Sequence, residues 1–174
     1  MKTRLVNEFR GSWIDYPSND GVCLSLYFTG CQGLCQNCQN KDLQDPTHGT
    51  EFEIENLINR ISHEAKRLRT NKITLLGGDP LFHTNIDFVR ELLERTHKKF
   101  DYCLYTGYDV NFVFTNEIRY FKFLKTGLYD ETLSQQSLKT DDYFQLASKN
   151  QKIYDEDFKQ ISTDGILYFK KVKE

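Results

Sequence analysis

The stretch Gly30-Cys31-Gln32-Gly33-Leu34-Cys35-Gln36-Asn37-Cys38-Gln39-Asn40 carries three cysteines with the spacing C-x3-C-x2-C. It directly follows an apolar run, Val22 to Phe28, that is typical of a buried strand. A loop at the end of a strand is a rigidly supported place for a reactive centre. The stretch therefore predicts a chemical site at a strand end.

Thiolates at this density suit soft metals: zinc, copper(I) or an iron–sulfur cluster. A structural zinc site takes four ligands, and a complete cubane cluster is normally held by four cysteines. Three close cysteines without an obvious fourth favour a cubane in which one iron stays open for a ligand that is not protein. The alternative is a zinc site completed by Cys23, His48 or His63. Cys23 and Cys103 lie inside apolar runs, where free cysteine is commonly a small buried hydrophobe.

The composition indicates a globular protein of 174 residues, which suits one domain over residues 1–174. A net charge of -2 argues against general binding to nucleic acid. No apolar stretch approaches the roughly 20 residues of a membrane helix, and the start lacks a signal peptide's apolar centre. We therefore expect a cytoplasmic protein without a membrane partner. In that reducing compartment, clustered cysteines indicate metal binding or catalysis rather than disulfides. The odd number of five cysteines also argues against a fully paired disulfide framework.

Downstream of the cysteine loop, strands and helices alternate. Residues 52–69 and 85–98 show helical spacing of apolar side chains, whereas residues 72–76 and 100–105 read as short buried strands. In the first helix the apolar stripe comprises Ile54, Leu57, Ile58, Ile61, Ala65 and Leu68. The order strand, helix, strand, helix, strand predicts parallel strands with right-handed helical crossovers.

Other segments show weaker patterns. Thr50 and Glu53 have the form of a capping box for the first helix. Residues 118–124 indicate a further strand, residues 130–164 a polar region of loop or short helix, and residues 165–169 a last strand. A full eight-fold barrel needs about 250 residues. We therefore expect an α/β fold that forms a partial β/α barrel, mainly of parallel strands.

Two further loops should lie beside the cysteines, because each follows a strand of the same sheet. Gly77-Gly78-Asp79-Pro80 could let backbone approach a ligand, and its carbonyls with the Asp79 carboxylate could hold an ammonium group. Tyr105-Thr106-Gly107-Tyr108 offers a hydroxyl and aromatic rings for an adenosine moiety. The alternatives are an ordinary glycine turn and an aromatic strand end.

Together these motifs resemble the radical SAM superfamily, whose signature is C-x3-C-x2-C followed by a GGE or GGD element. Among its members the chain is most similar to the activating protein of the anaerobic (class III) ribonucleoside-triphosphate reductase. The stretches that carry the resemblance are Tyr27–Asn40, Leu76–Leu81, Tyr105–Tyr108, Thr126–Tyr129 and Ala147–Gln151. The chain departs from the family pattern at Asn37 and Gln39, where an aromatic often flanks the third cysteine, and at Thr126, where an aspartate is usual.

The resemblance implies a 4Fe-4S cluster and S-adenosyl-L-methionine (SAM) as cofactors. Cys31, Cys35 and Cys38 would ligate three irons, and the amino and carboxylate groups of SAM would chelate the fourth. The residues expected to contact SAM are Asn37, Cys38, Gln39, Gly77, Gly78, Asp79, Pro80, Thr106 and Tyr108.

The resemblance also implies the activity of a glycyl-radical-activating oxidoreductase. The reduced cluster would cleave SAM and produce a 5′-deoxyadenosyl radical, which removes a hydrogen from a glycine in the large subunit of the reductase. A one-electron donor such as a flavodoxin would supply the electron. Because the cofactors perform the hard chemistry, we expect no catalytic side chain. The open side of a partial barrel would admit the partner's glycine loop.

Two other functions fit parts of the pattern. One is a radical SAM enzyme that acts on a small molecule, as the deazapurine-forming members do. The Thr-Gly-Tyr element and Ser148-x-Asn150-Gln151 favour the activase over it. The other is a zinc-stabilised binding module without enzymatic activity, which a metal analysis would identify.

Overall fold

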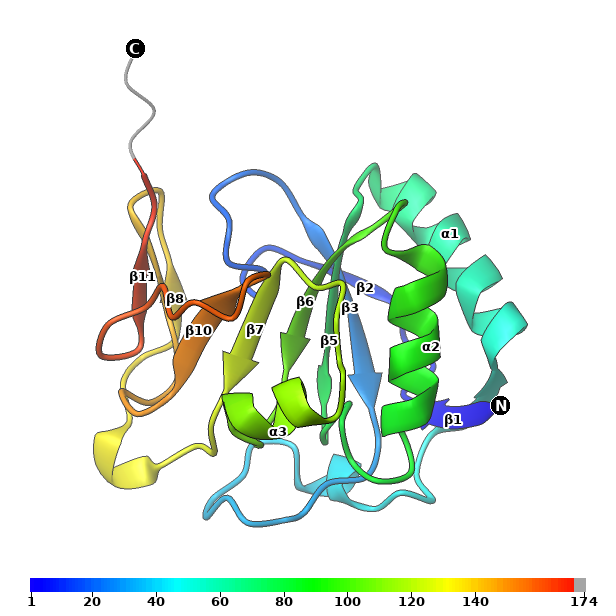
Figure 1. Cartoon of the computed structure of the whole chain (residues 1–174), viewed down its shortest axis with the longest axis horizontal. Helices are drawn as coiled ribbons and strands as arrows, with labels where there is room; N and C mark the ends of the chain where they lie inside the picture. Colours follow the sequence, from blue (N-terminus) through cyan, green and yellow to red (C-terminus); the bar gives the residue numbers. More distant parts are fainter. Residues whose placement is uncertain (171–174) are drawn as a thin grey trace.

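The computed structural model describes residues 1–170, which form one eight-stranded sheet, a small three-stranded sheet and three α-helices (Figure 1). The elements are β1 (Lys2–Leu5), β2 (Arg10–Ser12), β3 (Cys23–Phe28), η1 (Lys41–Gln44), β4 (Thr50–Glu53), α1 (Ile54–Leu68), β5 (Lys72–Gly77), α2 (Ile86–Thr96), β6 (Asp101–Tyr105), α3 (Val110–Thr115), β7 (Phe123–Thr126), η2 (Glu131–Leu133), β8 (Leu138–Lys139), β9 (Tyr143–Gln145), β10 (Lys152–Asp155) and β11 (Ile166–Tyr168).

The centre of the large sheet is parallel, with β3, β5, β6 and β7 side by side. The outer strands β1, β2, β4 and β10 join it antiparallel. The order β10-β7-β6-β5-β3-β1-β4 leaves the sheet open, with β10 at one edge and β4 at the other. The expected α/β fold with parallel central strands that do not close into a barrel is therefore confirmed.

All three α-helices contribute to a core against one face of the sheet. Side chains alternate along a strand, so β3, β5 and β6 each send every second residue into this core. The apolar stripe of α1 and the buried residues of α2 cover them. The largest fully buried side chains of this core include Phe28, Tyr102, Phe88, Leu57, Ile61 and Leu92.

Within residues 1–170, no α-helix packs on the other face of the sheet, here called the inner face. Cys23 and Cys103 point to it and pack with Tyr16, and both cysteines are 1% exposed. The prediction that they are small buried hydrophobes is confirmed. Towards the carboxyl ends of the strands this face stays open, and the pocket described below lies there.

Several local predictions are wrong. The capping box is absent, because Thr50 pairs with Leu5 in β4 and Glu53 precedes α1 without a side-chain cap. The strand expected over 118–124 is β7, which begins only at Phe123. The polar region 130–164 contains β8, β9 and β10, which pair with distant segments and so escape local patterns.

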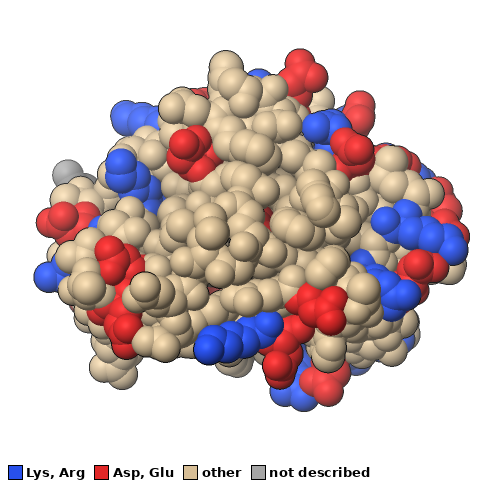
Figure 2. Space-filling view, turned by 90° about the horizontal axis from the view of Figure 1, so that it is seen from below, with Lys and Arg blue, Asp and Glu red and all other residues tan. Residues whose placement is uncertain are grey.

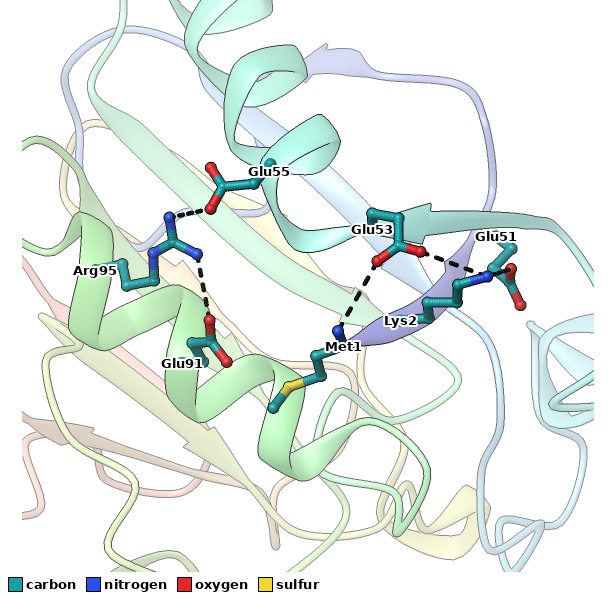
Figure 3. Close-up of polar contacts among 7 residues, drawn as sticks. All are labelled: Met1, Lys2, Glu51, Glu53, Glu55, Glu91 and Arg95. Carbon is teal, nitrogen blue, oxygen red and sulfur yellow. Dashed lines mark hydrogen bonds and ion pairs between the residues drawn. The ribbon is translucent and has the colours of Figure 1, made fainter.

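Exposed ion pairs lie at the edge of the sheet and between the helices (Figure 3). Lys2 in β1 pairs with Glu51 and Glu53 of β4, while Arg95 of α2 pairs with Glu55 of α1 and with Glu91. Such solvent-exposed pairs contribute little to stability. None of the helices within residues 1–170 has the length and apolarity needed to span a bilayer.

Candidate functional site

The parallel strands β3, β5, β6 and β7 all end on the lower side of the molecule in Figure 1. The segments that follow them line one pocket with a volume of about 230 Å³. A larger hollow of about 470 Å³ lies at the opposite, amino ends of β6 and β7 and contains none of the predicted site residues. The rim with the carboxyl ends of the strands is the one on which the three sequence motifs meet.

All three loop cysteines line this pocket, and each is partly exposed to it. The Sγ atom of Cys38 accepts a hydrogen bond from the Asn40 amide at 3.4 Å. Burial raises the pKa of the Cys31 thiol. The loop is anchored to η1, because the Gly30 amide donates to the Leu43 carbonyl at 2.8 Å.

The donor set of the pocket suits a cluster better than a single metal ion. Within residues 1–170, no three His, Cys, Asp or Glu side chains converge on a point where one ion could sit. Three sulfurs that line a pocket without converging suit a polynuclear cluster, in which each thiolate ligates a different iron. Cys23 cannot complete a zinc site there, since it lies in β3 at the opposite end from the loop. His63 is an exposed residue of α1.

The two glycines at the end of β5, Gly77 and Gly78, are required by the close approach of β3 and the cysteine loop. A Cβ atom on Gly77, which has a φ of +118°, would lie 2.5 Å from the Phe28 carbonyl oxygen. A Cβ atom on Gly78 would lie 2.6 Å from the Gly30 carbonyl oxygen and would also overlap the Leu43 carbonyl. The backbone amides of Gly78 and Asp79 donate to the carbonyls of Phe28 and Gly30. The two loops are therefore in direct backbone contact, which only glycine permits.

Asp79 fastens the glycine loop to the loop after β6. Its carboxylate accepts hydrogen bonds from the Leu81 amide at 2.9 Å, the Thr106 hydroxyl at 2.9 Å and the Gly107 amide at 2.9 Å. The side chain is only 2% exposed, and burial raises the pKa of its carboxyl group. Because its oxygens already have three donors, we expect Asp79 to position the two loops. A ligand's ammonium group would then meet backbone carbonyls.

A second buried polar group, which the sequence analysis did not identify, extends this network. The Asn85 side chain donates to the Thr29 carbonyl at 2.8 Å and to the Asp79 carbonyl at 3.1 Å. It accepts from the Thr3 hydroxyl at 2.9 Å. The start of the cysteine loop, the glycine loop and β1 are thus held together by one amide. No sequence signal marked Asn85, because asparagine before a helix is common.

The residues predicted for the site fall into two groups. Cys31, Cys35, Cys38, Gln39, Gly77, Gly78, Asp79 and Thr106 all line the pocket. Asn37, Pro80 and Tyr108 do not. The Asn37 side chain donates to Glu131 at 2.6 Å, Pro80 is buried, and the Tyr108 ring stacks on Phe112 at 3.8 Å. The role of each residue towards a cofactor stays a prediction.

The remaining wall of the pocket comes from residues 127–129, with Ala147 and Gln151 beside them. The Gln151 side chain donates to the Gly127 carbonyl at 3.3 Å, and Asn150 donates to the Leu128 carbonyl at 2.9 Å. The motif Ser148-x-Asn150-Gln151 therefore holds this wall in place. Lys125 of β7 also lines the pocket and carried no signal in the sequence.

The surface around the pocket is largely uncharged. Figure 2, which views the molecule from the carboxyl-end rim, shows an uncharged centre with Lys, Arg, Asp and Glu of both signs around it. Leu34 of the cysteine loop is 61% exposed. Such a surface suits contact with a backbone or apolar segment rather than with a polyanion.

Residues 19–154 match the profile of the family described as 4Fe-4S single cluster domain. A protein of Enterobacteria phage T4 is 26% identical over 156 residues, which cover 87% of this chain and 92% of the phage protein. One of Salmonella typhimurium is 29% identical over 103 residues, covering 56% of this chain and 66% of the relative. Both are named anaerobic ribonucleoside-triphosphate reductase-activating protein.

Among solved structures, QueE from Escherichia coli is similar with a TM-score of 0.44 and 16% identity, over 60% of this chain and 53% of the QueE chain. The match to the family profile covers the cysteine loop, the glycine loop and the central strands. The chain belongs to the 4Fe-4S single cluster domain family.

Proposed function

We propose that this protein is a radical SAM activase that generates a glycyl radical on an anaerobic ribonucleotide reductase. The observation that carries the proposal is that Cys31, Cys35 and Cys38 line the same pocket as the Gly77–Asp79 loop. The names of the phage and Salmonella relatives support the choice of the reductase as the target. We further propose that residues 1–174 form a single radical SAM domain and that the protein acts in the cytoplasm.

In this proposal the three cysteines each ligate one iron of the 4Fe-4S cluster, and SAM takes the fourth. When bound, the cluster supplies the electron that cleaves SAM reductively. The chain's own residues would bind and orient the cluster and SAM. Gln39, Gly78 and Thr106 line the space for SAM, and the Asp79 and Asn85 contacts keep the loops at a fixed separation. Holding reacting groups in fixed geometry is a large part of such catalysis.

The partner in this proposal approaches from the uncharged side of the molecule. The pocket opens on the inner face, which no α-helix of residues 1–170 covers, and charges of both signs surround it among the residues coloured in Figure 2. A glycine loop of the large reductase subunit, with little side-chain bulk, suits this opening. A one-electron donor such as a flavodoxin would reduce the cluster.

The experiment is anaerobic reconstitution with iron and sulfide, followed by reduction and mixing with SAM and the reductase. We expect 5′-deoxyadenosine and a glycine-centred EPR doublet on the large reductase subunit. Turnover of a small substrate without the reductase would instead favour the deazapurine-forming type of enzyme. Colourless protein with one zinc per chain and no iron or sulfide would contradict both.

Cysteine variants provide the matched control for this experiment. Cys35→Ala should abolish SAM cleavage, because it removes one of three sulfurs in the pocket. Cys103→Ala should retain cleavage and lose only packing, since Cys103 is buried on the inner face away from the pocket. SAM cleavage that persists in Cys35→Ala would overturn the ligand assignment.

A further inference from the structure

Lys125 is the only cationic side chain that lines the pocket within the described part of the chain. It lies in β7, where it is in register with Tyr105 of β6 and Ile153 of β10. Its neighbours along the strand alternate between the faces of the sheet. Leu124 packs into the helical core and Phe123 packs on the inner face, so Lys125 follows Phe123 to the inner face. The strand therefore directs its ammonium group towards the pocket.

No residue from 1 to 170 pairs with this ammonium group. The described ion pairs and side-chain hydrogen bonds do not include Lys125 Nζ, whereas Lys2, Lys72 and Lys122 each pair with a carboxylate. The contact it makes is with the ring of Tyr105, whose centroid lies 5.4 Å from Nζ. Asp79, the carboxylate in the pocket, already receives its hydrogen bonds from Leu81, Thr106 and Gly107.

An ammonium group in such a place needs compensation. Lys125 is half-buried, and its partial removal from water costs free energy that one aromatic contact offsets only in part. Burial lowers the pKa of Lys125 to about 8, and the proximity of Cys35 and Asp79 acts in the opposite direction. Since no carboxylate within residues 1–170 pairs with it, a negatively charged group held by the cysteine loop would supply the compensating charge across the same pocket.

We propose that the Lys125 ammonium group is the electrostatic partner of the cluster held by Cys31, Cys35 and Cys38, and that it raises the cluster's midpoint potential. This inference rests on the proposed function. The cluster gains one electron from a one-electron donor, and no bond is formed or broken in that step. The reduced cluster carries one more negative charge than the oxidised cluster. A positive charge across a pocket of low dielectric therefore stabilises the reduced form. Lys125 acts as a positioning charge and not as a catalytic residue.

The test is an EPR-monitored redox titration of the full-length reconstituted protein without SAM. Lys125→Met and Lys125→Gln should lower the midpoint potential, with an expected effect of about tenfold on the one-electron equilibrium, which corresponds to about 59 mV. Lys125→Arg keeps the charge and should stay close to wild type. Lys122→Met is the matched control, because Lys122 directly precedes the same strand, is exposed and pairs with Glu156. Its potential should equal that of wild type.

Equal midpoint potentials in wild type, Lys125→Gln and Lys125→Met would overturn the inference. So would variants that weaken only SAM binding, since that result would make Lys125 a partner of the SAM carboxylate. If Lys125→Met does not hold the cluster, the comparison of Lys125→Gln with Lys125→Arg decides. Wild-type protein that incorporates no cluster overturns the proposed function as well, whereas normal titration of wild type beside unshifted variants overturns this inference alone.

Discussion

Asp79 at the rim of the sheet and Glu64 of α1 both expose little surface, 2% and 6%. Asp79 lies inside the protein, whereas Glu64 lies at the surface beside two exposed arginines. The Asp79 carboxylate accepts only from uncharged donors, two amides and one hydroxyl of neighbouring loops. Glu64 instead pairs with Arg60 at 3.1 Å and Arg67 at 2.7 Å. The two carboxylates therefore have different kinds of hydrogen-bond partners.

The difference appears in the pKa values of the two groups. Burial raises the pKa of Asp79, whereas the hydrogen bond from Arg67 lowers the pKa of Glu64. A lowered carboxyl pKa is typical of a surface ion pair that adds modestly to stability. A raised carboxyl pKa is typical of a group whose charged form is destabilised by burial. At the rim, the buried Asp79 carboxylate thus holds the loops of the candidate site in position.

The largest expected effect is that of Asp79→Ala. It leaves two amides and a hydroxyl without their acceptor in a buried place, so we expect the free energy of unfolding to fall by about 3 kcal/mol. Asp79→Asn retains an acceptor oxygen and should lose less. Equilibrium urea unfolding of cluster-free protein measures both. An Asp79→Ala protein as stable as wild type would show that the rim network is not stabilising.

Asn85→Ala should come next, with a loss of about 2 kcal/mol, because the variant removes two buried donors and the acceptor of Thr3. The matched control is Thr84→Ala. Thr84 is exposed, and its hydroxyl makes one contact of 3.3 Å with the same amide. Equal unfolding midpoints for the two variants would contradict the structural role assigned to Asn85.

Asp79 and Glu64 should change the free energy of unfolding in opposite directions as the pH rises. The folded state binds the Asp79 proton more tightly than the unfolded state, so this group makes stability fall as the pH rises from about 4 towards the raised pKa. Glu64 has the opposite sign, and its contribution is lost as the pH falls below the ordinary glutamate value and through the lowered pKa. Asp79→Asn should flatten the decline of stability above pH 4, and Glu64→Gln should flatten the decline of stability below pH 4.

At pH 7, Glu64→Gln should lower the free energy of unfolding by about 0.5 kcal/mol, because solvent screens the two exposed arginines.

The smallest effect is expected on the exposed pairs of Figure 3. Glu55→Gln breaks the pair between α1 and Arg95, but both side chains are well exposed. The urea midpoint should not change beyond the scatter between replicates, and added salt should not alter the comparison with wild type. A clear loss of stability would mean that the contact between α1 and α2 depends on this pair.

Much of the fold could be predicted from local patterns. Three strands, β3, β5 and β6, are apolar runs, and the helices α1 and α2 show apolar side chains at helical spacing. All five elements are confirmed. The short strands β1, β2, β8 and β9 have two to four residues each. Strands this short contain too few residues for a period-two pattern, and their pairing with distant segments defines them.

The sequence by itself determined which chemistry this protein can support. The spacing of three cysteines after a buried strand, and the glycines after the next one, could be read without any structure. The tertiary structure alone decided that Asp79 accepts hydrogen bonds from two loops, that Asn85 joins three segments, and that Lys125 lines the same pocket as the cysteines. The physical reason is that these properties depend on contacts between residues far apart in the chain. A motif specifies the groups present, whereas burial and the partners nearby specify what each group does.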